Sequence, residues 1–157
     1  INAAGIVSTN MALSTDESTI QKLIQTNLVG TIYCCQVFAP MMLRQKKGIF
    51  INFSTIAVAL ALKGESIYAA SKAGVEAFSR TFAREISNYN VRVNCIAPGP
   101  INTDMLKGLT NTQIEKILSN QIISKQFQKS DVCDLVELLI DKKASSLSGQ
   151  VLNVGGV

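Results

Sequence analysis

The chain is organised around residues 66–74, with the sequence SIYAASKAG. Apolar residues recur at helical spacing from this point, so the segment is predicted to begin a helix. On that helix Tyr68 and Lys72 lie about one turn apart on the same face. A free tyrosine has a pKa of roughly 10, and a fixed cation beside it favours the phenolate and lowers that pKa. The pair therefore predicts a tuned proton donor, the alternative being a chance pairing on a helix surface.

Helices and strands alternate on both sides of this segment. Apolar periodicity predicts helices over residues 17–45, 66–87, 112–120 and 130–142. Short apolar runs predict strands over 49–53, 91–97 and 149–156, and residues 1–7 indicate the end of another strand. This order predicts an α/β fold with a parallel sheet and right-handed crossovers. We expect residues 1–157 to form a single domain or part of one.

The composition narrows the possible chemistry. Histidine is absent, which excludes Ser-His-Asp catalysis, Cys-His catalysis and any histidine-based metal site, so no metal is expected. The net charge of +4 comes from dispersed lysines and arginines, which favours solvated helix ends over nucleic-acid binding. No apolar run approaches the roughly 18 residues of a membrane-spanning helix, so no membrane association is expected.

The four cysteines predict a reducing compartment. They are Cys34, Cys35, Cys95 and Cys133, in apolar surroundings and without a Cys-x-x-Cys pair. Buried free thiols in the cytoplasm are expected rather than disulfides or zinc ligands.

Three further polar residues are candidates for a site. Ser54 and Thr55 follow the strand predicted over 49–53, and ligands of parallel sheets bind at the carboxyl ends of strands. The alternative for both is an ordinary turn or cap residue. Asn27 lies on the apolar stripe of the helix predicted over 17–45, where its amide needs a partner. It is either a satisfied core asparagine or part of the site.

Several motifs together carry a family resemblance. They are Asn2-Ala3-Ala4-Gly5, Thr26-Asn27-Leu28, the pair Tyr68 and Lys72, the run PGPINTDM at 98–105, Ser148-Gly149-Gln150 and Gly155-Gly156. In this order and spacing they resemble the carboxyl-terminal two thirds of a short-chain dehydrogenase/reductase, most nearly the 3-oxoacyl-(acyl carrier protein) reductase type. The resemblance implies a Rossmann-like, doubly wound parallel sheet.

The resemblance also implies roles for individual residues. The implied catalytic residues are Asn27, Thr55, Ser54, Tyr68 and Lys72. Thr55 occupies the position of the family's catalytic serine, with Ser54 in reserve, and Asn27 would hold a water that links Lys72 to solvent. The implied cofactor-binding residues are Asn2, Ala3, Gly5, Tyr68, Lys72, Pro98, Gly99, Ile101 and Thr103. The cofactor would be NADP or NAD, with NADP preferred by resemblance.

The family's Gly-rich turn, which holds the cofactor pyrophosphate, has no counterpart among the ten glycines. We therefore expect a partial dehydrogenase domain whose cofactor half precedes Ile1. The implied function is an NAD(P)-dependent oxidoreductase that interconverts a carbonyl and a secondary alcohol, such as a 3-oxoacyl thioester reductase. The alternatives are a non-catalytic scaffold or regulatory subunit of the same fold, and an epimerase or dehydratase.

By the same resemblance, residues 105–127 would form a substrate lid. The helices predicted over 17–45 and 66–87 would build a homodimer or homotetramer interface.

Overall fold

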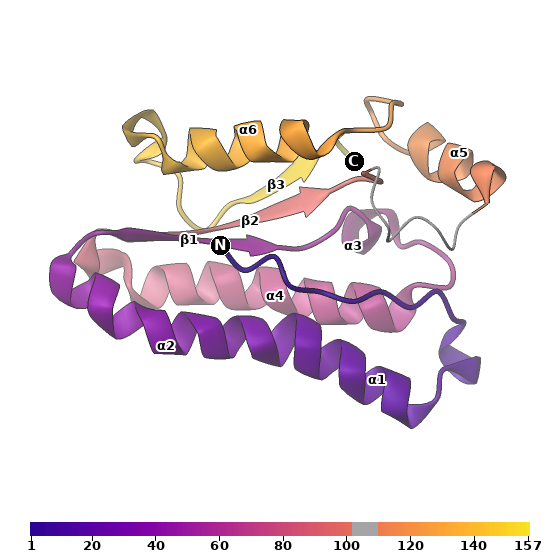
Figure 1. The fold of residues 1–157 in the computed structure, drawn as a ribbon, viewed down its shortest axis with the longest axis horizontal. Coiled ribbons are helices and arrows are strands. Elements are labelled where there is room, and N and C mark those ends of the chain that lie inside the picture. Colours follow the sequence, from indigo (N-terminus) through magenta and orange to yellow (C-terminus); the bar gives the residue numbers. More distant parts are fainter. Residues whose placement is uncertain (102–109) are drawn as a thin grey trace.

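The computed structural model describes residues 1–101 and 110–157. Within them lies a parallel sheet in the order β1-β2-β3, with β1 at Gly48–Phe53, β2 at Val91–Pro98 and β3 at Val151–Val154. In register, Phe50 lies beside Val93 and Cys95 lies beside Val151. Because the strands run in one direction, their carboxyl ends meet at one edge of the sheet (Figure 1). The predicted parallel α/β sheet is confirmed.

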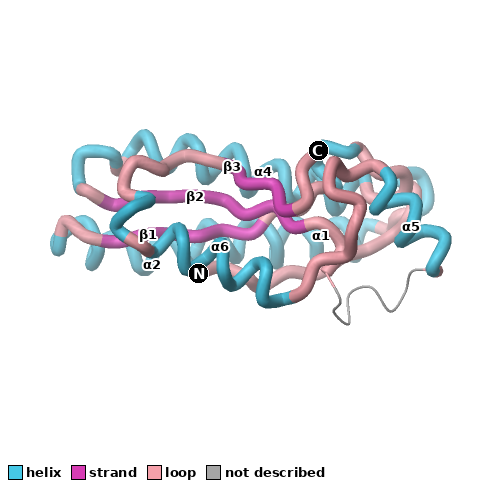
Figure 2. The backbone as a smooth tube through the Cα atoms, turned by 90° about the horizontal axis from the view of Figure 1, so that it is seen from above, coloured by secondary structure: helices cyan, strands magenta, loops and turns pink. Residues whose placement is uncertain are grey.

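Helices cover both faces of this sheet (Figure 1). One face carries α4 and a long helical run made of α1, the π-helical segment η2 and α2, while α6 covers the other face. Their bounds are Glu17–Leu23 for α1, Ile24–Val29 for η2, Gly30–Gln45 for α2, Ser66–Glu85 for α4 and Lys129–Ile140 for α6. Seen from above in Figure 2, the strands lie side by side with β2 in the middle. The doubly wound arrangement is thereby confirmed.

Shorter elements connect these layers. The 3₁₀ helices are η1 at Ala12–Ser14, η3 at Ser87–Tyr89 and η5 at Lys142–Ala144. Two more helices follow the strands, α3 at Ala57–Leu60 and α5 at Asn111–Ser119. Both lie near the carboxyl edge of the sheet (Figure 1). They contribute to the rim of the site described below.

The core has two halves because strand side chains alternate between the faces of a sheet. Phe50 and Val93 point to one face, where they pack with side chains of α2 and α4. Ile51 and Ile96 point to the other face, where they pack with side chains of α6. The apolar strand sequences are thus explained by burial on both sides, as in other parallel sheets.

Local differences from the sequence predictions have identifiable causes. Residues 1–7 form a single bridge, between Asn2 and Asn52, rather than the end of a regular strand. The helix predicted over 17–45 contains the π-helical turn η2, which includes Asn27. Other element boundaries shift by a few residues, as is usual where helices and strands fray.

Two expectations from composition meet differing observations. The run Glu17–Gln45 spans 29 residues with a window of mean hydropathy 1.2, so by length and composition alone it could cross a membrane. This is weak evidence, because core helices of soluble proteins pass the same test. All four cysteines are free, but Cys34 and Cys133 are exposed rather than buried. Both belong to amphipathic helices, on which an apolar sequence neighbourhood does not fix the face of one residue.

Candidate active site

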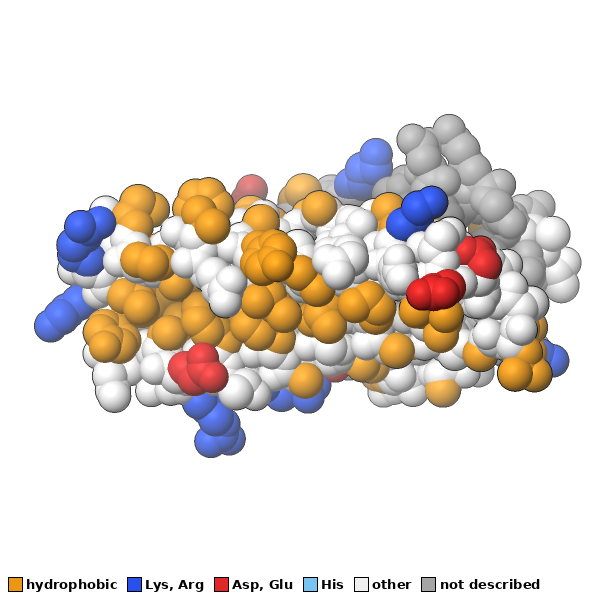
Figure 3. All heavy atoms as spheres, turned by 90° about the horizontal axis from the view of Figure 1, so that it is seen from below, with side chains coloured by type: hydrophobic (Ala, Val, Ile, Leu, Met, Phe, Trp, Pro, Cys, Tyr) orange, Lys and Arg blue, Asp and Glu red, His pale blue; other side chains and the backbone are white. Residues whose placement is uncertain are grey.

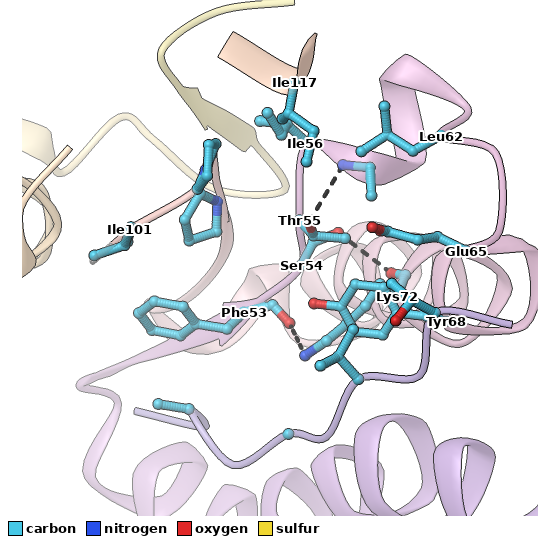
Figure 4. A pocket seen from close by; sticks show the side chains of 18 residues that line it. Phe53, Ser54, Thr55, Ile56, Leu62, Glu65, Tyr68, Lys72, Ile101 and Ile117 are labelled. Carbon is cyan, nitrogen blue, oxygen red and sulfur yellow. Dashed lines mark hydrogen bonds between the residues drawn. The ribbon is translucent and has the colours of Figure 1, made fainter. Parts of the chain in front are cut away.

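Tyr68 and Lys72 meet in one cavity at the carboxyl edge of the sheet (Figure 4). They lie near the start of α4, and 7% of Tyr68 and 5% of Lys72 is exposed. The cavity has a volume of about 380 Å³. Helical spacing places both side chains on the face of α4 that looks toward the end of β1.

The end of β1 supplies the partners of this pair. The Lys72 Nζ donates a hydrogen bond to the Phe53 carbonyl oxygen at 2.9 Å. The Thr55 side chain lines the same cavity as Tyr68 and lies close enough to the Tyr68 phenol to influence its pKa. Groups from the end of β1 and from the start of α4 therefore converge on one space, as the strand-end position of Thr55 predicts.

The two neighbouring hydroxyls, Ser54 and Thr55, have different surroundings. Ser54 is buried, and its Oγ donates to Glu76 Oε1 on α4 at 2.7 Å. The Thr55 Oγ1 accepts from the Ala57 backbone N–H at 3.2 Å and lies beside Tyr68. Both residues line the cavity, but only Ser54 is tied to a carboxylate.

The electrostatics of Tyr68 differ from the sequence expectation. Burial raises the pKa of Tyr68 to about 12, the neighbouring Thr55 hydroxyl opposes this, and the charge of Glu65 adds to it. Burial also lowers the pKa of Lys72, an effect that the charge of Cys95 opposes. The expected lowering of the tyrosine pKa is thus reversed, because the loss of water disfavours the phenolate more than nearby groups favour it.

Asn27 is fully buried and holds the first segment against the helices. Its Oδ1 accepts from the Ile6 N–H at 2.8 Å, and its Nδ2 donates to the Ile6 carbonyl at 2.9 Å and to Ser71 Oγ at 3.0 Å. The Ser71 Oγ in turn donates to the Tyr68 carbonyl at 2.7 Å. Asn27 is therefore a satisfied asparagine that links the first segment to α4, and its role toward a water stays a prediction.

Gly5 fits the space beside this link. A Cβ at Gly5 would lie 3.1 Å from Lys72 Nζ and 3.3 Å from Asn27 Oδ1, so a larger residue would press on both. Ala3 and Gly5 line the cavity. The Asn2 side chain points to the sheet instead, where its Nδ2 donates a hydrogen bond to Asn52 Oδ1 at 2.8 Å. The structure therefore gives Asn2 a partner within the sheet rather than a place at the cavity.

The loop after β2 forms the opposite wall. Pro98, Gly99 and Ile101 line the cavity, and Ile101 makes a bridge with Phe127. A Cβ at Gly99 would meet the end of the Gln121 side chain and lie 3.3 Å from the Val154 carbonyl oxygen, so a larger residue here would displace Gln121. Thr103 lies outside the described residues, as does the start of the predicted lid.

Sequence reasoning missed three polar residues near this cavity. Glu65 lines it directly, and Ser71 connects Asn27 to α4. Gln121 is buried behind Gly99, and its amide has no hydrogen-bond partner among the residues that the structure describes. Ser71 could have been found, because it lies on the same turn as Lys72. Glu65 and Gln121 carried no signal, since each reaches the site only through tertiary packing.

Known proteins match this arrangement. A family model described as Enoyl-(Acyl carrier protein) reductase matches residues 1–156. The 3-oxoacyl-[acyl-carrier-protein] reductase FabG of Staphylococcus aureus is 35% identical over 156 residues, covering 99% of this chain and 63% of the relative. The FabG of Chlamydia muridarum is 35% identical over 158 residues, with the same coverage. The chain thus spans less than two thirds of the length of these curated relatives.

Solved structures of dehydrogenases and reductases share this fold. A 4-hydroxyisoleucine dehydrogenase complexed with NADH superimposes with a TM-score of 0.91 at 28% identity, covering 99% of this chain and 65% of that one. A 3-oxoacyl-[acyl-carrier protein] reductase from Brucella melitensis gives a TM-score of 0.91 at 25% identity, covering 98% and 60%. Sequence match, fold and the convergence of Tyr68, Lys72 and Thr55 lead to one conclusion: the chain belongs to the short-chain dehydrogenase/reductase family.

Proposed function

We propose that the protein is an NAD(P)-dependent oxidoreductase that interconverts a carbonyl and a secondary alcohol. 3-Oxoacyl thioesters are its first candidate substrates, because FabG relatives are named for them. The observation that carries the proposal is the meeting of a phenol, a hydroxyl and an ammonium, from Tyr68, Thr55 and Lys72, at one cavity. A scaffold would have no need for these three groups at a ligand-sized space.

In this proposal Tyr68 is the proton donor. A pKa of about 12 keeps its hydroxyl protonated at neutral pH, so it can donate to the oxygen of a bound carbonyl. Thr55 donates a hydrogen bond to the same oxygen and holds it beside Tyr68. Lys72, fixed by the Phe53 carbonyl, lies on the same helix face and stabilises the tyrosinate left after proton transfer. Ser54 is a positioning residue, because Glu76 already engages its hydroxyl.

The cavity suits the nicotinamide end of NAD(P). Gly5 and Gly99 have no side chains and leave space at opposite walls of the cavity. A side chain at Gly5 would meet Lys72, and one at Gly99 would meet Gln121. Ala3, Gly5, Pro98, Gly99 and Ile101 would border the cofactor, with NADP preferred on resemblance alone. When bound, the nicotinamide supplies the hydride. The protein's part is to orient the carbonyl and to deliver the proton.

A homodimer or homotetramer is part of the proposal. The outer face of α2 exposes large apolar side chains, namely Tyr33, Val37, Phe38 and Met41. Figure 3 shows a band of apolar side chains along this side of the molecule. A band of this kind is typical of an interface between subunits.

Free thiols support a cytoplasmic location for the protein. That residues 1–157 form a single domain stays a prediction.

The test is cofactor oxidation by the full-length gene product, with NADPH and NADH, against 3-oxoacyl thioesters and small ketones. Tyr68→Phe should lower kcat by about 100-fold or more, because the proton donor is lost. Tyr89→Phe, at an exposed tyrosine beyond the end of α4, is the matched control and should keep full activity. A wild type that shows no turnover and binds no cofactor would overturn the proposal and favour the non-catalytic alternative.

A further inference from the structure

Glu65 is a buried carboxyl that faces the cavity without a donor among the described residues. Only 8% of it is exposed, and it occupies the N-cap position of α4 without making a capping hydrogen bond. Glu76, on the same helix and also 8% exposed, accepts from Ser54 at 2.7 Å and from Arg80 at 2.9 Å. The two carboxyls are equally buried, but only that of Glu76 is satisfied by the protein.

A mostly buried carboxyl without a donor from the protein is unfavourable, because it has lost most of its water and has gained no hydrogen bond in exchange. Burial accordingly raises the pKa of Glu65 above its ordinary value. Leucine in this place would avoid the penalty. Groups of this kind concentrate at functional sites, where a ligand provides the missing partner.

The position of Glu65 indicates which ligand it would meet. In Figure 4 the side chain lies between Leu62 and Tyr68, with its carboxyl end turned toward Thr55. The neighbouring walls are apolar, formed by Val7, Ile56, Leu62 and Ile117. A carboxylate in an apolar wall, next to the proposed proton donor, selects among ligands by their polar groups.

We propose that Glu65 determines substrate specificity by accepting a hydrogen bond from a hydroxyl or ammonium group close to the substrate carbonyl. This inference rests on the proposed function. The carboxylate would repel the negative charge that develops on a plain ketone's oxygen, whereas a donor on the substrate offsets that repulsion. The cavity would therefore favour carbonyl compounds that carry a neighbouring donor over those that carry none.

The test uses three ketones with the same reacting carbonyl: butan-2-one, 3-hydroxybutan-2-one and 3-aminobutan-2-one. The readout is the ratio of kcat/KM for each donor-bearing ketone to kcat/KM for butan-2-one, measured with the full-length gene product. The wild type should favour the donor-bearing ketones, and Glu65→Leu should lower at least one ratio by about tenfold. A loss of folded protein lowers all three rates together and cancels in the ratio.

Glu65→Gln separates the two donors. It keeps an acceptor without charge, so it should retain more of the hydroxyketone ratio than of the aminoketone ratio. Glu85→Gln, at an exposed position near the other end of α4, is the control and should leave both ratios at their wild-type values. Ratios in Glu65→Leu within twofold of the wild type would overturn this inference and leave the reductase proposal standing. A wild type that reduces neither the ketones nor 3-oxoacyl thioesters would overturn both.

Discussion

Two hollows at opposite ends of the sheet use their polar side chains differently. A cleft at the amino ends of β2 and β3 has a volume of about 750 Å³, against about 380 Å³ for the cavity at the carboxyl edge. In the larger cleft, Arg92 donates to the carbonyl oxygens of Leu139 at 2.7 Å and Ala144 at 2.9 Å. Ser148 Oγ accepts from the Val93 N–H at 3.2 Å. The polar side chains of this cleft therefore form hydrogen bonds with backbone atoms of the protein itself.

In the smaller cavity, Tyr68 and Glu65 point into the open space, and Lys72 is held beside it by one carbonyl. The difference teaches that the number of uncommitted polar groups, and not the size of a hollow, marks a reactive site. The amino-end cleft should therefore govern stability, and the carboxyl-edge cavity should govern activity at some expense of stability.

The largest expected effect is on activity at the carboxyl edge. Thr55→Val removes the hydroxyl proposed to hold the carbonyl oxygen and should lower kcat by about 100-fold to 1,000-fold, as loss of an oxyanion donor does. Thr55→Ser keeps the hydroxyl and should stay within about tenfold of wild type. Steady-state kinetics measures both, and equal activity of the two variants would contradict a role for the hydroxyl.

The next effect is on stability at the amino end. Arg92→Met leaves the Leu139 and Ala144 carbonyls without their charged donor and should lower the free energy of unfolding by about 3 kcal/mol. The kcat of the folded protein should not change. Denaturant unfolding measures this, with the exposed Arg84→Met in the same cleft as control, expected within about 0.5 kcal/mol. If Arg92→Met instead abolished activity in folded protein, the contrast between the two hollows would fail.

The raised pKa of Tyr68 predicts a pH effect of somewhat smaller size. A tyrosine in the unfolded chain ionises near pH 10, whereas Tyr68 in the folded chain keeps its proton until about pH 12. The unfolded state therefore releases its proton first, and the free energy of unfolding falls by roughly 2 to 3 kcal/mol as the pH rises through this interval. Tyr68→Phe should lose correspondingly less stability between pH 10 and 12. An identical loss in both proteins would contradict the burial of Tyr68.

The smallest effect concerns the unsatisfied amide behind Gly99. Gln121 is 4% exposed, and both polar atoms of its amide are buried without a partner in the described structure. Gln121→Met keeps a similar volume without polar atoms and should raise the free energy of unfolding by about 1 kcal/mol. The exposed neighbour gives the control Gln126→Met, which should change it by less than about 0.5 kcal/mol. Destabilisation by Gln121→Met would mean that the amide has a partner.

The sequence by itself determined the features that depend on near neighbours. Helical spacing put Tyr68 and Lys72 on one face, and apolar runs marked β1, β2 and β3 in an order that required a parallel sheet. Thr55 was predicted at the carboxyl edge because strand ends meet there. Such features arise from periodicity within one element or from the direction of parallel strands, so a linear pattern carries them.

Tertiary structure alone decided the rest. It tied Ser54 to Glu76, 22 residues away, and Asn27 to Ser71, 44 residues away. It also turned Glu65 into the cavity and buried Tyr68 enough to raise its pKa. No local pattern contains these outcomes, because hydrogen-bond partners and loss of water depend on which distant segments pack together.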